Sequence, residues 1–206
     1  MNNSEKLLSN FAEKYFTDEL VFYKILLFIV IIFAIIVIAL IAKKYIGNQI
    51  NEENNAQIVE EIKQHERTTE PIKFGNNSII GIINIPKIDL EYPILDITTK
   101  ENMRTSITRF SGGNVNEIGN LALAGHNNYD GTMFGKNDEL VVGDKIYLTD
   151  LQKNTVEYEI NSIFVTDPND VSILETNEEE IREVTLITCE NGNKARLIIK
   201  AEEVKK

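Results

Sequence analysis

The longest apolar stretch of the chain is residues 25–42, ILLFIVIIFAIIVIALIA, which contains no charged side chain. A helix needs about 20 apolar residues to cross the hydrocarbon core of a bilayer. Lys24 precedes the stretch, and Lys43 and Lys44 follow it, where ammonium groups can reach the membrane interface. Because the run is longer than the apolar core of a cleaved signal peptide, it predicts an uncleaved transmembrane helix rather than a buried core helix. Residues 1–24 then form a short tail.

The segment that follows, residues 43–74, is polar and rich in Asn, Gln and Glu. Within it, Ile50, Ile58 and Ile62 recur at roughly helical spacing. This pattern predicts a partly helical, solvated stalk that holds the remaining chain away from the membrane.

From residue 78 onward, short apolar runs alternate with Gly, Pro and Asn, which is typical of short strands joined by turns. Helical signals are weak, with one short helix expected within 99–109 and a single turn at 177–182. Many short strands favour an all-β domain, a closed barrel or a sandwich, over residues 75–206. The candidate strands lie within 79–95, 120–126, 144–150, 155–167, 183–189 and 195–201.

Charge narrows the range of partners. The 206 residues contain 21 Lys+Arg and 32 Asp+Glu, for a formal net charge of −11. Nucleic-acid binding depends mainly on cations that neutralise phosphates. The acidic balance therefore argues against a nucleic-acid partner.

The β-domain contains one cysteine, Cys189, and one histidine, His126, and each follows an apolar strand. A thiolate can act as a nucleophile when an imidazole nearby manages the protons. Functional residues commonly gather where strands end on a rigid scaffold. The pair therefore suggests nucleophilic catalysis, although a lone cysteine is also common as a small buried hydrophobe.

Arg196 can join this pair through a hairpin. Asn191-Gly192 is a strong signal for a two-residue turn, which would pair residue 187 with 196 and residue 189 with 194. Arg196 would then be a diagonal neighbour of Cys189 on one face of the sheet. A turn one residue longer would place Arg196 on the opposite face. The core face would collect Val184, Leu186, Leu197 and Ile199.

These motifs resemble those of the sortases, the membrane-anchored cysteine transpeptidases of Gram-positive surfaces. The resemblance rests on TLITC (185–189) with an arginine downstream, LALAGH (121–126) and IPKIDLEYPIL (85–95), and it extends over roughly 78–201. It implies a closed eight-stranded β-barrel outside the cell, with the N-terminal tail in the cytoplasm. The short segment between Phe164 and Arg182 is similar to class A, and the short loop after the cysteine leaves class D open.

The resemblance also implies a reaction: cleavage of an LPxTG-like sorting signal after Thr through a thioacyl-enzyme. The acyl group then passes to an amine of a cell-wall precursor of the lipid II type or to a pilin lysine. By motif, Cys189 is the nucleophile, His126 the acid and base, and Arg196 the group that binds substrate and stabilises the oxyanion. Thr188 matches a position that contacts substrate.

No cofactor is expected. The acidic loop at 175–180 is most simply a solvated loop, with calcium binding as the weaker alternative because hard cations favour clustered carboxylates. A zinc site is the least favoured alternative, since one Cys and one His fall short of the usual three or four ligands.

Two other interpretations remain open. One is a cysteine hydrolase that releases the acyl group to water. The other is a non-catalytic, membrane-tethered β-domain with a buried cysteine.

Overall fold

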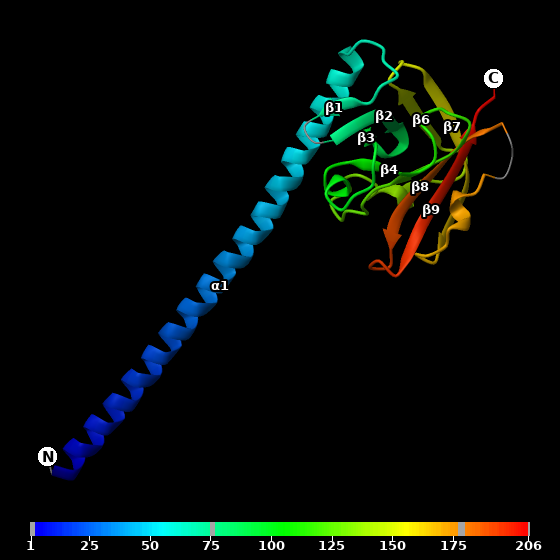
Figure 1. Cartoon of the computed structure of the whole chain (residues 1–206). Coiled ribbons are helices and arrows are strands. Elements are labelled where there is room, and N and C mark those ends of the chain that lie inside the picture. Colours follow the sequence, from blue (N-terminus) through cyan, green and yellow to red (C-terminus); the bar gives the residue numbers. More distant parts are fainter. Residues whose placement is uncertain (1–2, 75–76, 177–179, 206) are drawn as a thin grey trace. The chain divides into compact units, whose positions relative to one another are not determined.

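The computed structural model describes residues 3–74, 77–176 and 180–205 (Figure 1). The chain divides into two compact units, Met1–Ile50 and Asn51–Lys206. Each unit is described by itself.

A single helix, α1 (Asn3–Gln64), begins in the first unit and ends in the second. It includes the whole apolar run at 25–42, whose side chains are exposed. In the described part of the chain, this is the one helix long and apolar enough to cross a membrane. The segment expected to be partly helical is helical without interruption as far as Gln64.

The second unit is a closed barrel. The sheet order is β1-β2-β3-β4-β5-β8-β9-β7-β6, and an additional β2–β6 pairing joins its two ends. The predicted eight-stranded barrel is therefore confirmed, with β1 as an additional strand paired to β2. The strands are β1 (Ile72–Phe74), β2 (Asn77–Ile85), β3 (Leu90–Leu95), β4 (Ile107–Ser111), β5 (Gly119–Ala124), β6 (Lys145–Asp150), β7 (Thr155–Thr166), β8 (Arg182–Glu190) and β9 (Ala195–Glu203).

Helical structure between the strands is limited to single 3-10 turns in the described residues, and the short helix expected within 99–109 is one such turn. That range contains only η2 (Asn102–Arg104), and Ile107 already belongs to β4. Ile107 and Thr108 are fully buried between β3 and β5, and this packing decides the local conformation. Of the turn expected at 177–182, residues 177–179 lie outside the described residues, and Arg182 begins β8. The other turns are η1 (Pro86–Ile88), η3 (Asn137–Glu139) and η4 (Ser172–Leu174).

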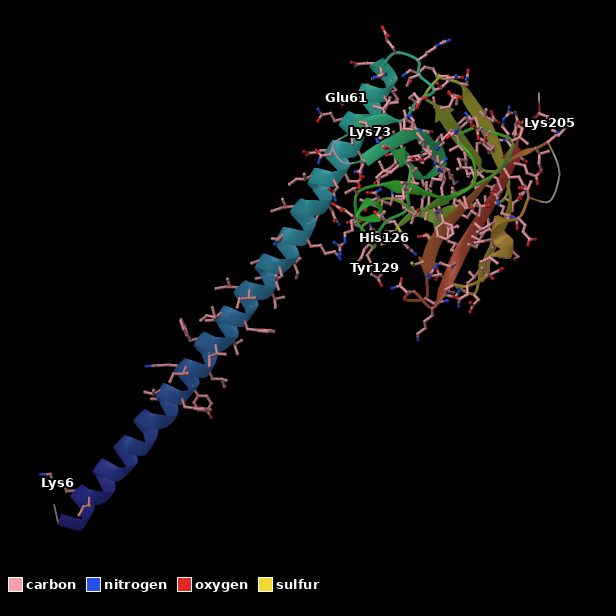
Figure 2. All side chains as sticks on the ribbon, viewed as in Figure 1. Lys6, Glu61, Lys73, His126, Tyr129 and Lys205 are labelled. Atoms are coloured by element: carbon pink, nitrogen blue, oxygen red, sulfur yellow. The ribbon has the colours of Figure 1, made fainter. Side chains whose placement is uncertain are left out.

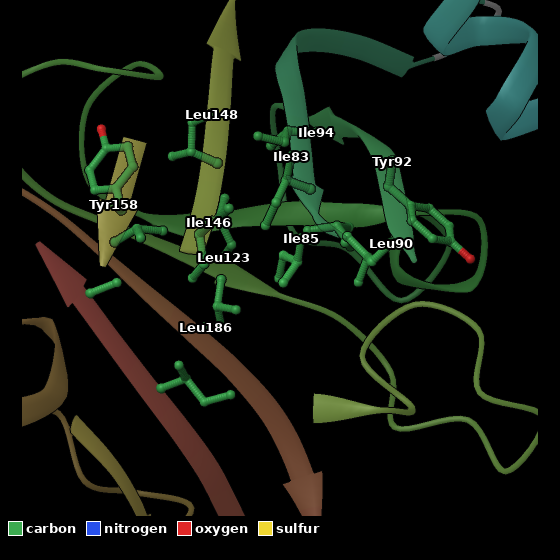
Figure 3. Close-up of a cluster of buried hydrophobic side chains, with 14 of the residues drawn as sticks. Ile83, Ile85, Leu90, Tyr92, Ile94, Leu123, Ile146, Leu148, Tyr158 and Leu186 are labelled. Carbon is green, nitrogen blue, oxygen red and sulfur yellow. The ribbon is translucent and has the colours of Figure 1, made fainter. Parts of the chain in front are cut away.

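The barrel is filled by one large apolar cluster, part of which is drawn in Figure 3. Ile83, Leu123, Ile146 and Leu186 have no exposed surface and come from four different strands. Burying each such side chain contributes about 1.5–3 kcal/mol, so the core holds the strand ends in fixed positions.

The final turns of α1 belong to the barrel unit rather than to a solvated stalk. Ile58, Val59 and Ile62 are buried, and they share a second apolar cluster with residues of the barrel. The side-chain amide of Asn55 donates to the carbonyl of Thr105 at 2.7 Å. The compact unit therefore starts at Asn51, whereas a domain boundary was expected at residue 75. The barrel residues in this cluster are Ile79, Ile82, Leu95 and Leu151.

Candidate functional site

Two neighbouring strands bring the candidate cysteine and histidine to the same end of the barrel. Strands β5 and β8 are parallel, and their last aligned pair is Ala124 with Ile187. One residue further on, the amide of Gly125 donates to the carbonyl of Ile187 at 3.2 Å. Since the two strands run in the same direction, His126 and Cys189 each lie two residues after this pair (His126 is labelled in Figure 2).

Two side-chain hydrogen bonds fasten the cysteine strand to the histidine loop. The hydroxyl of Thr188 donates to the carbonyl of Gly125 at 2.9 Å, and the amide of Asn127 donates to the carbonyl of Cys189 at 3.0 Å. Sequence reasoning missed Asn127. Its position immediately after the histidine was the only available signal, and Asn is common in loops for many reasons.

Thr188 has a structural contact in addition to its expected role at the substrate site. Its side chain is 2% exposed, and its hydroxyl is used by the bond to Gly125. The residue lines the pocket described below, but this hydroxyl points to a neighbouring strand. We therefore assign the Thr188 hydroxyl to positioning Cys189 relative to His126, and the contact of this residue with substrate stays a prediction.

Thr188→Val tests this positioning role. Valine retains the shape but leaves the Gly125 carbonyl without its donor, which typically costs about 1–3 kcal/mol when the group is buried. Thermal unfolding should show a lower Tm for Thr188→Val, whereas Thr188→Ser, which keeps the hydroxyl, should retain most of the stability. Equal stability of Thr188→Val and the unsubstituted protein would contradict the assignment.

The loop after His126 is anchored in the core. Phe134 is fully buried, and its amide donates to the His126 carbonyl at 3.0 Å. A Cβ atom at Gly125 would lie 2.7 Å from the Phe134 ring, so glycine is required by this close approach. An isolated bridge also pairs Asn127 with Met133. The histidine is therefore carried by a closed loop.

Arg196 lies directly opposite Cys189, a closer arrangement than the predicted diagonal one. Glu190 pairs with Ala195, so the turn has four residues, 191–194, and the predicted two-residue turn was wrong. Asn191, Gly192 and Asn193 have φ values of 50°, 63° and 74°. Three successive left-handed residues extend the turn by two positions, and side-chain alternation then keeps Arg196 on the predicted face.

The opposite face of this hairpin serves the core, as predicted. Val184, Leu186 and Ile199 belong to the main cluster, and Leu197 is 7% exposed.

A pocket of about 250 Å³ lies over the cysteine face. Cys189 is partly exposed and lines this pocket together with Arg196, which does not support the interpretation of a buried cysteine. The guanidinium of Arg196 donates to the carbonyls of Asn193 at 3.3 Å and Ala195 at 2.9 Å. Apolar residues form much of the remaining wall, including Met103, Phe110, Val171, Ile173, Leu174 and Ile187.

His126 lines a second, adjoining hollow of about 490 Å³. Thr98 and Met103 line both cavities, so they form the partition between the cysteine side and the histidine side. Thr98 is fixed there by its hydrogen bonds to the Thr108 hydroxyl (2.7 Å) and the Arg109 carbonyl (2.8 Å). Sequence reasoning missed this partition because no local pattern shows that Thr98 and Met103 border both cavities.

Metal binding receives no support from the described residues, which contain no group of three or more His, Cys, Asp or Glu side chains that could hold an ion. In the acidic loop at 175–180, Glu178 and Glu179 lie outside the described residues.

Comparison with known proteins gives consistent matches. The family model described as "Sortase domain" matches residues 83–204. The chain is 35% identical over 117 residues to Sortase A of Bacillus anthracis, which covers 56% of this chain and 54% of that protein. It is 33% identical over 145 residues to Sortase A of Listeria monocytogenes, which covers 68% of this chain and 64% of that protein. The chain thus spans between about half and two thirds of the length of these relatives.

Solved structures give the same picture for the fold. The barrel is similar to a Clostridium perfringens Sortase D5 transpeptidase, with a TM-score of 0.56 and 30% identity. This similarity covers 73% of this chain and 89% of that one.

Proposed function

Because the chain belongs to the sortase family, we propose that it is a membrane-anchored cysteine transpeptidase that cleaves LPxTG-like sorting signals after Thr. It transfers the surface protein to an amine of a cell-wall precursor of the lipid II type or to a pilin lysine. Class A-like or class D is the subclass proposed. The helix at 25–42 anchors the enzyme, with the N-terminus in the cytoplasm and the barrel outside.

In the first half-reaction, the Cys189 thiolate attacks the carbonyl carbon of the Thr residue in the sorting signal. The C–S bond forms and the carbonyl oxygen becomes an oxyanion, toward which the Arg196 guanidinium donates. The C–N bond then breaks, and the His126 imidazolium gives its proton to the departing amine. The products are a thioacyl-enzyme and the released C-terminal fragment.

In the second half-reaction, the acceptor amine enters through the hollow beside His126. The nitrogen of the acceptor amine attacks the thioacyl carbon, and the neutral His126 imidazole removes a proton from this amine. The C–S bond breaks and restores the thiolate–imidazolium pair. Entry from the histidine side keeps the acceptor close to its base, while the apolar pocket retains the acyl portion.

The observation that carries the proposal is the parallel pairing of β5 with β8, tied by Thr188 and Asn127, at the edge of a pocket that Cys189 and Arg196 both line. A pocket with an apolar wall suits the apolar side chain of a sorting signal.

The direct test uses the full-length chain in detergent micelles with a fluorogenic LPxTG peptide, with and without triglycine. Mass spectrometry of the products should reveal the peptide acyl group joined to triglycine. Hydrolysed peptide alone, at a rate that does not respond to triglycine, would instead support the hydrolase. Absence of cleavage, together with protection of Cys189 from a methanethiosulfonate reagent, would support the non-catalytic domain.

Replacing Arg196 with alanine should lower kcat/KM by about 10²-fold, the typical effect of removing one oxyanion donor. Arg196→Lys retains the charge but not the planar fork of donors, and should recover only part of the loss. Lys194→Ala, an exposed cation in the turn just before Arg196, is the matched control and should have little effect. Near-normal turnover by Arg196→Ala would remove the guanidinium from the mechanism.

A further inference from the structure

Glu52, near the start of the barrel unit, makes an unusual contact for a residue of a solvated helix. Its carboxylate is half-buried and accepts a hydrogen bond from the hydroxyl of Tyr92. The Tyr92 ring is 5% exposed and belongs to the main core cluster. Its hydroxyl oxygen points away from the other labelled side chains of that cluster (Figure 3).

The same hydroxyl continues to the histidine loop. The amide of Met133 donates to the Tyr92 hydroxyl oxygen at 3.0 Å. Met133 is bridged to Asn127, and the next residue, Phe134, donates to the His126 carbonyl. Glu52 is thus connected, through one tyrosine, to the loop that follows the histidine.

Simple anchoring of the helix does not account for this carboxylate. Burial raises the pKa of Glu52, the bond from Tyr92 lowers it, and the carboxylate of Asp130 raises it further. Partial burial of a carboxylate lowers the stability of the fold, because the group loses contact with water. The apolar contacts of Ile58, Val59 and Ile62 already fix the helix. The arrangement is better explained by the orientation that a hydrogen bond confers on the tyrosine.

The same part of α1 also supports the partition between the two cavities. The amides of Asn51 and Asn55 donate to the carbonyls of Arg104 at 3.3 Å and Thr105 at 2.7 Å. These carbonyls directly follow Met103, which lines both cavities. One helical segment therefore contacts both Tyr92, which bonds to the histidine loop, and the segment that lines the hollow beside His126.

We propose that Glu52 is a positioning residue for catalysis: through Tyr92, it holds the loop that carries His126 in its working position. This inference rests on the proposed acid and base role of His126. It makes the part of α1 that belongs to the barrel unit a support of the catalytic site.

The test compares Glu52→Ala, Tyr92→Phe and Glu52→Gln in the full-length chain, with Glu53→Ala as the matched control because Glu53 is an exposed acid on the same helix. Glu52→Ala and Tyr92→Phe should lower kcat roughly 10-fold, because even a small displacement of a catalytic group lowers the reaction rate. The KM for peptide and the rate of Cys189 labelling should stay unchanged.

Glu52→Gln still accepts a hydrogen bond from the tyrosine, so this variant should retain the kcat of the unsubstituted enzyme. The Glu52→Ala/Tyr92→Phe double variant should be no worse than Tyr92→Phe alone.

Hydrogen exchange of a peptide covering residues 126–134 gives a readout that does not depend on activity. Protection should fall in Glu52→Ala and Tyr92→Phe but not in Glu52→Gln or Glu53→Ala. Unchanged exchange would overturn the link between Glu52 and the loop. Faster exchange with an unchanged kcat would overturn its importance for catalysis. If the chain transfers no acyl group at all, the function proposed above fails, and so does any catalytic role for Glu52; the exchange data would then report only whether Glu52 holds the loop.

Discussion

Replacing Cys189 with alanine is expected to abolish cleavage and transfer, with a loss of at least roughly 10³-fold in kcat. No other thiol exists in the chain to take over the attack. Incubation of the unsubstituted enzyme with a sorting-signal peptide should produce a covalent acyl-enzyme mass that is absent from Cys189→Ala.

The stability of Cys189→Ala provides the control for this experiment. Because the thiol is partly exposed and lines a pocket instead of filling the core, the Tm should change little. Residual turnover well above this limit, in a folded variant, would mean that the thiol is not the nucleophile.

The second large effect is expected for His126→Ala, which should lower kcat by about 10²–10⁴-fold, the usual contribution of general acid–base catalysis. The defect should depend on the leaving group. An amine must be protonated to leave, whereas a thiolate leaves without a proton. A peptide with a thioester in place of the scissile amide should therefore recover much of the lost acylation rate in His126→Ala.

His65→Ala is the matched control, because His65 is exposed just after the end of α1 and its ring bonds to the adjacent Glu66 carbonyl. Its activity should equal that of the unsubstituted enzyme. If His126→Ala loses the same factor on the amide and on the thioester, the imidazole is not the acid for the leaving group.

Much of the barrel could be predicted from sequence, because half-buried strands carry a strong local pattern. The runs at 120–126, 144–150 and 183–189 became β5, β6 and β8 within about two residues. The placement of Cys189 and His126 at strand ends came from the same pattern. This prediction did not require knowing which strands are neighbours in the sheet.

The features that were missed depend on contacts distant in sequence. Strand β4 was missed because its pairing with β3 and β5, rather than local propensity, sets its conformation. The docking of Ile58, Val59 and Ile62 needs the outer surface of the barrel, which the polar composition of the segment conceals. The turn length was misjudged because Asn193, like Asn191 and Gly192, adopts a left-handed conformation.

The number of residues in the turn at 191–194 decides whether Arg196 lies on the same face of the hairpin as Cys189. An insertion or deletion of two residues would preserve the side of the ribbon on which position 196 emerges. A change of one residue would invert it and drive a cation toward the barrel interior. Length variation in this exposed loop, ordinarily the most tolerant kind, is therefore constrained to even steps wherever the arginine is needed.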